Sequence, residues 1–143
     1  MNSKDLAGKG FVGWPLITSR NVPEVMSMLP KEPGIYVFRT LEAKHAIRGK
    51  SDIAYIGKGT RVGGIQARVR EHFHQPALPT TKTPSGRIDQ WINEWGYDVE
   101  IGWLVCKTKA EAGVAEQGLV QEFEADHHNL PPINRNMPGG PAR

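Results

Sequence analysis

The chain has 143 residues, of which 38% are hydrophobic, 18 are Lys or Arg and 15 are Asp or Glu. This composition is typical of one globular domain with a hydrophobic core and argues against a disordered chain. The single cysteine, Cys106, excludes an intrachain disulfide framework and a cysteine-based zinc site. No run of residues resembles a membrane helix or a secretion signal, so we expect a cytoplasmic protein with no membrane partner.

Positive charge is concentrated in the middle of the chain. Residues 44 to 75 contain seven Lys or Arg and two Asp or Glu, whereas the whole chain has a net charge of only +3. Such a basic region is typical of proteins that bind a polyanion, although a solvated lysine-rich hairpin would carry the same charges. We take as candidate substrate-binding residues Arg48, Lys58, Arg61 and Arg70.

Residues 1 to 32 are interpreted as an N-terminal extension. Phe11 and Trp14 belong to a stretch that is too apolar to remain in water, so this segment should pack on the core or on a partner. Covering a sheet edge is the simplest role for it. Pro23 near the start of residues 22 to 29 predicts a short helix.

Two short apolar runs, residues 34–38 and 53–57, predict strands because they are rich in β-branched and aromatic residues between turn formers. The charged residues 42–50 suit a solvated connection that ends in a turn, so an antiparallel hairpin is expected. Each strand carries one tyrosine, Tyr36 in the first and Tyr55 in the second.

Residues 65–74 predict a basic helix whose apolar stripe consists of Ile65, Val69 and Phe73. Arg68 and His72 lie one turn apart along one side of this stripe. A guanidinium matches the geometry of a phosphate, and an imidazole can donate a hydrogen bond or carry a proton. The pair is therefore suited to hold a phosphate oxygen, and the alternative is an ordinary pair on the surface.

The next elements are predicted from prolines and periodicity. Residues 75–84 contain three prolines and predict a loop, and Ser85 is placed to cap a helix that runs to about Trp95. The tryptophans of this helix are interpreted as core residues rather than as base-stacking platforms. Residues 98–106 alternate between apolar and other residues and predict the third strand of the sheet.

A last helix, from about residue 109 to 126, places Glu116 inside an apolar stripe formed by Ala112, Ala115, Leu119, Val120 and Phe123. A carboxylate on a buried face is costly unless it is paired or bound to a cation. Helix geometry alone leaves two interpretations equal. Glu116 either forms a structural salt bridge, for instance with Arg68, or binds a metal ion.

In chain order, the Gly34-Ile35-Tyr36 and Tyr55-Ile56-Gly57 tripeptides are followed by further candidates that complete a pattern: Arg68 with His72, Glu116 and Asn134. This pattern, over about residues 33 to 136, resembles the signature of the GIY-YIG nuclease superfamily. The resemblance implies a DNA endonuclease that hydrolyses phosphodiester bonds with the catalytic residues Tyr36, Tyr55, Arg68, His72, Glu116 and Asn134.

The resemblance also implies a divalent cation, Mg²⁺ or Mn²⁺, held by Glu116. One carboxylate in the right place favours one ion that keeps several waters over a two-metal site. The sequence does not decide which of Tyr36 and Tyr55 is the general base. Asn134 is preferred over Asn136 only because an apolar residue precedes it after a proline.

The expected fold is α/β (α+β), with a small central three-stranded antiparallel sheet flanked by helices over residues 33–136 and a disordered tail at 137–143. The pairing of Arg68 with His72 looks more like the restriction-enzyme branch of the superfamily than its repair branch. A sequence-specific double-strand cut would require a homodimer on DNA, for which Phe11 and Trp14 are candidate contacts. The alternatives are a structure-selective or non-specific nicking nuclease and a catalytically inactive nucleic-acid-binding module.

Overall fold

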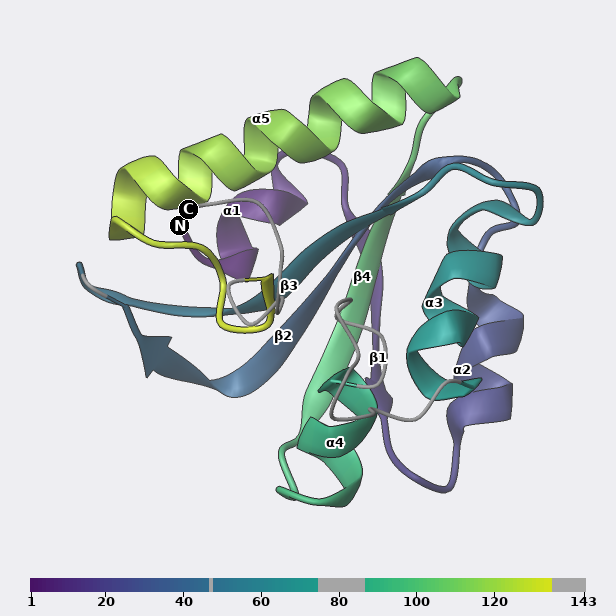
Figure 1. The fold of residues 1–143 in the computed structure, drawn as a ribbon, viewed down its shortest axis with the longest axis horizontal. Helices are drawn as coiled ribbons and strands as arrows, with labels where there is room; N and C mark the ends of the chain where they lie inside the picture. The colour runs from purple at the N-terminus through teal and green to yellow at the C-terminus, as the bar shows by residue number, and fades with distance from the viewer. Residues whose placement is uncertain (47, 75–86, 135–143) are drawn as a thin grey trace, which may run out of the picture.

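The computed structural model describes residues 1–46, 48–74 and 87–134. Within these residues a four-stranded antiparallel sheet, in the order β1-β4-β2-β3, lies between helices on both faces (Figure 1). The strands are β1 (Val12–Ile17), β2 (Gly34–His45), β3 (Lys50–Gly59) and β4 (Val99–Val105). The helices are α1 (Ser3–Ala7), α2 (Val22–Met28), α3 (Gly64–His74), α4 (Arg87–Asn93) and α5 (Lys109–His127). The predicted fold class is confirmed.

The prediction of three strands was wrong, because β1 adds a strand at one edge of the sheet. It pairs antiparallel with β4, from Val12 opposite Trp103 to Ile17 opposite Val99, with a register shift between Gly13 and Leu16. The sequence signal is weak because a glycine and a proline interrupt the apolar run. Edge strands tolerate both residues and often carry such irregularities.

The β2–β3 hairpin is longer than the sequence suggested. The expected solvated connection at residues 42–50 is largely strand, because Lys44 pairs with Ser51 and His45 with Lys50. The turn is closed by a hydrogen bond from the Ala46 N–H to the Gly49 carbonyl, at 3.0 Å. Charged residues are compatible with this outer part of the hairpin because their side chains are largely exposed.

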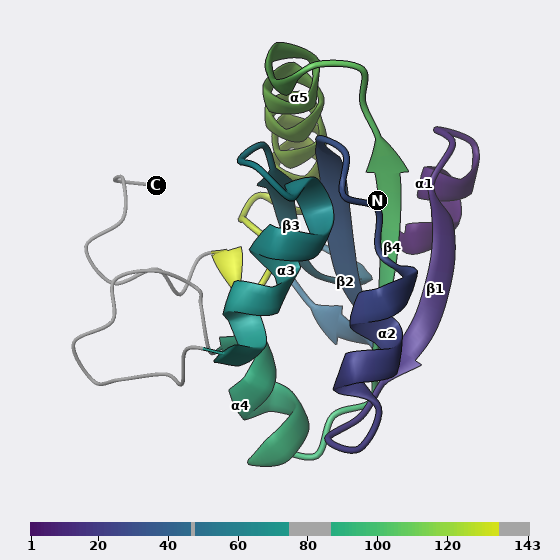
Figure 2. The same ribbon diagram turned by 90° about the vertical axis from the view of Figure 1, so that its right-hand side faces the viewer.

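Different helices lie over the two faces of the sheet (Figure 2), and each face has its own hydrophobic core. Tyr36, Phe38 and Tyr55 point to the face covered by α2, α3 and α4. The alternate residues of the same strands, including Ile35 and Ile56, point to the face covered by α1 and α5. Side chains on α3 and α5 can therefore meet only around the end or edge of a strand.

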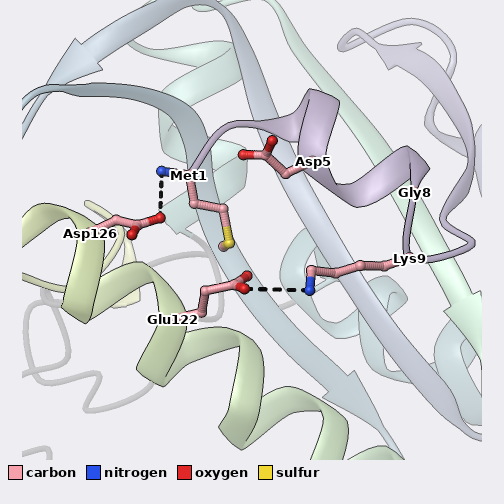
Figure 3. Close-up of a pocket in the computed structure, with 6 residues that line it drawn as sticks. All are labelled: Met1, Asp5, Gly8, Lys9, Glu122 and Asp126. Atoms are coloured by element: carbon pink, nitrogen blue, oxygen red, sulfur yellow. Dashed lines mark hydrogen bonds and ion pairs between the residues drawn. The ribbon is translucent and has the colours of Figure 1, made fainter.

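The first residues of the chain are held against α5 by two ion pairs (Figure 3). The Met1 amino group lies 2.9 Å from the Asp126 carboxylate, and Lys9 Nζ lies 3.4 Å from Glu122 Oε1. The Met1 amino group also lies 2.7 Å from Nε2 of the buried His127. Residues 1 to 9 are thus fixed to the helix that carries Glu116.

The proposed dimer contacts are used within the chain. Phe11 is only 5% exposed and belongs to the core beneath α5. Trp14 is half-buried, and the Arg39 guanidinium lies 4.0 Å from the centre of its ring. The assignment of Phe11 to a contact between two copies is therefore wrong, whereas that of Trp14 stays a prediction.

The helix before β4 matches its prediction in part. Trp91 is buried as expected, but Trp95 is 53% exposed and is not a core residue. Trp95 is exposed because α4 ends at Asn93, so that Trp95 lies beyond the helix. The predicted loop at 75–84, the cap at Ser85 and the tail at 137–143 lie outside the described residues.

Candidate active site

Tyr36 and Tyr55 are diagonal neighbours on one face of the β2–β3 hairpin, because Tyr36 lies opposite Gly57 and Phe38 opposite Tyr55. The centres of the two tyrosine rings are 6.0 Å apart. A Cβ atom at Gly57 would lie 2.6 Å from ring atoms of both tyrosines. Only glycine at position 57 therefore leaves room for this pair of rings.

His72 lies behind the tyrosines and is fully buried. Its Nε2 is 2.8 Å from the Tyr36 hydroxyl, and its ring meets those of Tyr36, Phe38 and Tyr55 edge-on, with centres 5.3–5.8 Å apart. The sequence placed His72 at a rim where it could touch a phosphate. In the structure its Nε2 contacts the Tyr36 hydroxyl, because α3 packs directly over the aromatic residues of the sheet.

Arg68 lies one helical turn before His72 and keeps contact with solvent, with its side chain 25% exposed. Its Nη1 donates a hydrogen bond of 2.6 Å to Oε2 of Glu71. A further hydrogen bond from the guanidinium to the Tyr55 hydroxyl favours the ionised form of that tyrosine. Arg68 therefore connects the buried tyrosines to the surface.

Glu71 is a site residue that the sequence analysis missed. It fixes the Arg68 guanidinium through a short charged hydrogen bond within one turn of α3. Opposite charges three residues apart on a predicted helix are a visible signal for such a pair. From the sequence, Arg68 was paired with His72 or with Glu116, and the nearer Glu71 was overlooked.

The two tyrosines differ in their electrostatic surroundings. Burial raises the pKa of Tyr36 well above its ordinary value, and the neighbouring Tyr55 raises it further. Burial also raises the pKa of Tyr55. The charge of the Arg68 guanidinium opposes the shift in both tyrosines, and at Tyr55 its hydrogen bond adds to this effect. The hydrogen bond between the hydroxyls favours ionisation of Tyr55 over that of Tyr36. Both hydroxyls keep their protons at neutral pH.

Glu116 of α5 is half-buried, with its side chain 26% exposed. Burial raises the pKa of its carboxyl, while Lys58 and Arg68 oppose the shift. Its ion-pair partner is Lys58, whose Nζ lies 4.0 Å from Oε1, rather than Arg68. The side chain of Lys58 is 45% exposed, so a pair at this distance contributes little to stability.

A groove of about 420 Å³ opens beside Glu116. It is lined by Lys58 of β3 and by residues of α5 that include Gln117 and Val120. It leaves room for water or a hydrated ion next to the Glu116 carboxylate. No group of three or more His, Cys, Asp or Glu side chains in residues 1–46, 48–74 and 87–134 is arranged to hold a metal ion. A divalent ion at Glu116 would therefore keep most of its ligands as water or substrate oxygens.

Asn134 is brought beside Tyr55 from a distant part of the chain. Its Oδ1 accepts a hydrogen bond from the Ile56 N–H and its Nδ2 donates one to the Ile56 carbonyl, both at 2.9 Å. The Ile133 N–H likewise donates to the Ala54 carbonyl at 2.9 Å. Asn134 thus holds the backbone of β3 in place. Asn136 lies outside the described residues.

The four candidate substrate-binding residues do not form one cluster. Lys58 is at the site, Arg61 is exposed in the turn that follows β3, and Arg70 is exposed on α3, where Nη2 lies 3.4 Å from a glutamine oxygen. Arg48 is at the tip of the hairpin, about 17 Å or more from Tyr55 along β3. Its predicted role in substrate binding would therefore concern DNA at a distance from the tyrosines.

His127 was given no role from the sequence, yet it is a buried structural residue. Its Nδ1 lies 2.7 Å from the Arg48 carbonyl, and its backbone carbonyl accepts a hydrogen bond of 3.0 Å from the Arg48 N–H. These contacts fix the hairpin tip to the end of α5.

In the described part of the chain, no helix is both long and apolar enough to cross a bilayer.

The chain is similar to UvrABC system protein C from Thermoanaerobacter sp. (strain X514) and from Thermoanaerobacter pseudethanolicus (strain ATCC 33223 / 39E). Identity is 23% over 119 residues in each case. These residues are 82% of this chain but 16% of each relative, so the similarity concerns a small part of that protein. No family model matches the chain, and no solved structure matches it.

Proposed function

We propose that the protein is a GIY-YIG nuclease that cleaves phosphodiester bonds in DNA with the help of a divalent cation. The observation that supports this most is the convergence of residues from four elements, β2, β3, α3 and α5, at one place. Tyr36 contacts His72 directly, and Arg68 and Glu116 are close enough to shift the pKa of both tyrosines. The similarity to UvrABC system protein C supports the general assignment as a nuclease, but not its finer details.

The residues present fit one divalent ion. Glu116 offers a half-buried carboxylate beside an open groove, and water and phosphate oxygens would complete the ligands of Mg²⁺ or Mn²⁺. When bound, the ion neutralises charge that develops on the phosphate during cleavage. Lys58 supplies a second positive charge on the same side of β3.

Tyr55 is proposed to meet the attacking water. It lies next to Arg68, whereas Tyr36 lies between Tyr55 and the buried His72. Movement of the Tyr36 proton to Nε2 of His72, and of the Tyr55 proton to Tyr36, leaves a Tyr55 oxyanion. Hydrogen bonds from Tyr36 and Arg68 favour this ionised form, which can take a proton from water.

Arg68 is proposed to hold the scissile phosphate. Its guanidinium is partly exposed, is fixed by Glu71 and points to the tyrosines. A fixed guanidinium can offer two parallel N–H donors to phosphate oxygens, which a lysine cannot do. Lys58 and Arg61 would contact neighbouring phosphates as exposed cations.

The finer proposal is a sequence-specific, restriction-like enzyme. One site with one ion cuts one strand, so a double-strand cut at a defined sequence requires two copies on a two-fold DNA site. A homodimer on DNA is therefore part of this proposal, with contacts other than the buried Phe11. The alternative is a monomer that nicks DNA at random or at particular DNA structures.

Incubation of a plasmid with the protein and Mg²⁺ or Mn²⁺, with and without a chelator, tests both the nuclease proposal and its restriction-like form. Metal-dependent cleavage supports the nuclease, and discrete fragments with a shared end sequence support the restriction-like form. Random nicks or cleavage only of branched DNA would favour the alternative. Binding without any cleavage would leave a nucleic-acid-binding module.

Glu116→Gln provides the test of the metal-binding residue. It should abolish cleavage and leave DNA binding largely intact, because the basic surface remains. The melting temperature should not fall, because burial disfavours the charged form of this carboxyl. Glu124→Gln removes the same charge from the same groove and is the matched control. Equal loss of activity in both variants would contradict the assignment.

A further inference from the structure

The turn between β3 and α3 presents an isolated apolar side chain to solvent. Val62 is 97% exposed, and its neighbours in the turn are Arg61, Gly63 and Gly64, none of which is apolar enough to cover it. Gly63 and Gly64 have φ angles of 90° and 56°, which favour glycine. A Cβ atom at Gly64 would lie 2.1 Å from the Glu32 carbonyl oxygen. The backbone path of the turn is thus fixed by its glycines.

Hydrogen bonds hold this turn on a rigid base. The Gly64 N–H donates to the Arg61 carbonyl at 2.8 Å and closes the turn. The next two N–H groups of α3 donate to the carbonyls of Glu32 and Pro30, at 3.1 and 2.8 Å. Val62 therefore extends from an anchored backbone, and it loses little conformational freedom when it binds a partner.

The turn lies close to the candidate active site and has the charge of a DNA-binding surface. Lys58 precedes it, and Arg61 is exposed within it. Arg68 follows Gly64 by about one helical turn, or roughly 6 Å along the helix axis. Since DNA rises about 3.4 Å per base step, Val62 would lie within about three steps of a phosphate bound by Arg68.

We propose that Val62 is an apolar wedge that packs against the bases of duplex DNA at a step near the cleaved phosphate. Arg61 would hold the adjoining backbone. The proposal rests on the proposed nuclease function and adds a specificity-determining residue to it. Apolar side chains that enter a base step unstack it, and the energy required depends on how easily that step deforms. The Val62 wedge would thus select DNA by its deformability.

Binding to duplexes that carry 2-aminopurine at successive positions tests the wedge, with a chelator present to prevent cleavage. The wild-type chain should increase the fluorescence at one step only. Val62→Ala and Val62→Thr should lose this increase and weaken binding about tenfold, as expected for a lost base contact. Their salt dependence should remain unchanged, whereas Arg61→Gln should reduce the slope by about one.

Val114→Ala is the matched control, because Val114 is another exposed valine, 73% exposed, and belongs to α5 rather than to the turn. Wild-type affinity, fluorescence and cleavage in Val62→Ala would overturn the wedge and leave the nuclease intact. Loss of a dimer in sedimentation of Val62→Ala would also overturn it, because Val62 would then contact a second copy. Failure of the wild-type chain to bind or cut any duplex would overturn the nuclease, and the wedge with it.

Discussion

Asn134→Ala is expected to destabilise the protein because it removes both contacts to the Ile56 backbone. Ile56 is fully buried, and the Asn134 amide satisfies its N–H and its carbonyl at 2.9 Å each. An unsatisfied buried polar group costs about 1–3 kcal/mol. Ile56 lies at a sheet edge, where water can replace part of the lost hydrogen bonding. We therefore expect the free energy of unfolding to fall by about 2–3 kcal/mol in total. This is a large fraction of the 5–15 kcal/mol of a typical domain.

Urea unfolding followed by circular dichroism measures this loss, with Asn93→Ala as control. Asn93 bonds only to another exposed side chain of α4 among the contacts described, so its loss should change stability by less than about 0.5 kcal/mol. Asn134→Asp keeps the acceptor for the Ile56 N–H but offers the carbonyl no donor, so it should also destabilise. Unchanged stability of Asn134→Ala with a hundredfold or greater loss of cleavage would refute the structural role and place Asn134 at the substrate.

Three further predictions concern the site. Gly57→Ala should lower stability and cleavage together, because its Cβ would lie 2.6 Å from the Tyr36 ring, whereas Gly118→Ala has open space and should add up to about 1 kcal/mol. Burial raises the pKa of Tyr36, so above about pH 10 the unfolded chain loses the Tyr36 proton before the folded chain does. Thermal melts should therefore show an unfolding free energy that falls above about pH 10, and Tyr36→Phe should make this fall smaller. Arg68→Lys should reduce cleavage about 10–100-fold and Glu71→Gln less, measured as kcat/KM, and unchanged cleavage in Arg68→Lys would show that only the charge of Arg68 matters.

The sequence predicted the elements that have a clear hydrophobic period. Both strands of the hairpin, β4, α2, α3 and α5 were located because each has several apolar residues at strand or helix spacing. The strand that was missed, β1, has glycine and proline within six residues and a positive φ at Trp14. Its strand conformation depends on pairing with β4, which is far away in the sequence.

The sequence indicated which face of a helix a site residue occupies, but not what covers that face. His72 was placed correctly on α3, yet its burial depends on Phe38 and the two tyrosines of the sheet. Asn134 was singled out only by resemblance, since its partner Ile56 is 78 residues away. Arg48 was proposed as a substrate-binding residue from charge alone, which does not indicate how far along the hairpin it lies from the tyrosines.

The strand order explains how one site can use residues from both faces of the sheet. Tyr55 and Lys58 are three residues apart on β3 and therefore point to opposite faces, one toward α3 and the other toward Glu116 of α5. Their side chains can act on one phosphate only if β3 is an edge strand, because another strand would separate the two faces. The extra strand β1 lies at the opposite edge, next to β4. Within the described ranges, the outer edge of β3 is contacted by Ile133 and Asn134 at Ala54 and Ile56, so under the proposed function the substrate would meet β3 from Gly57 onward.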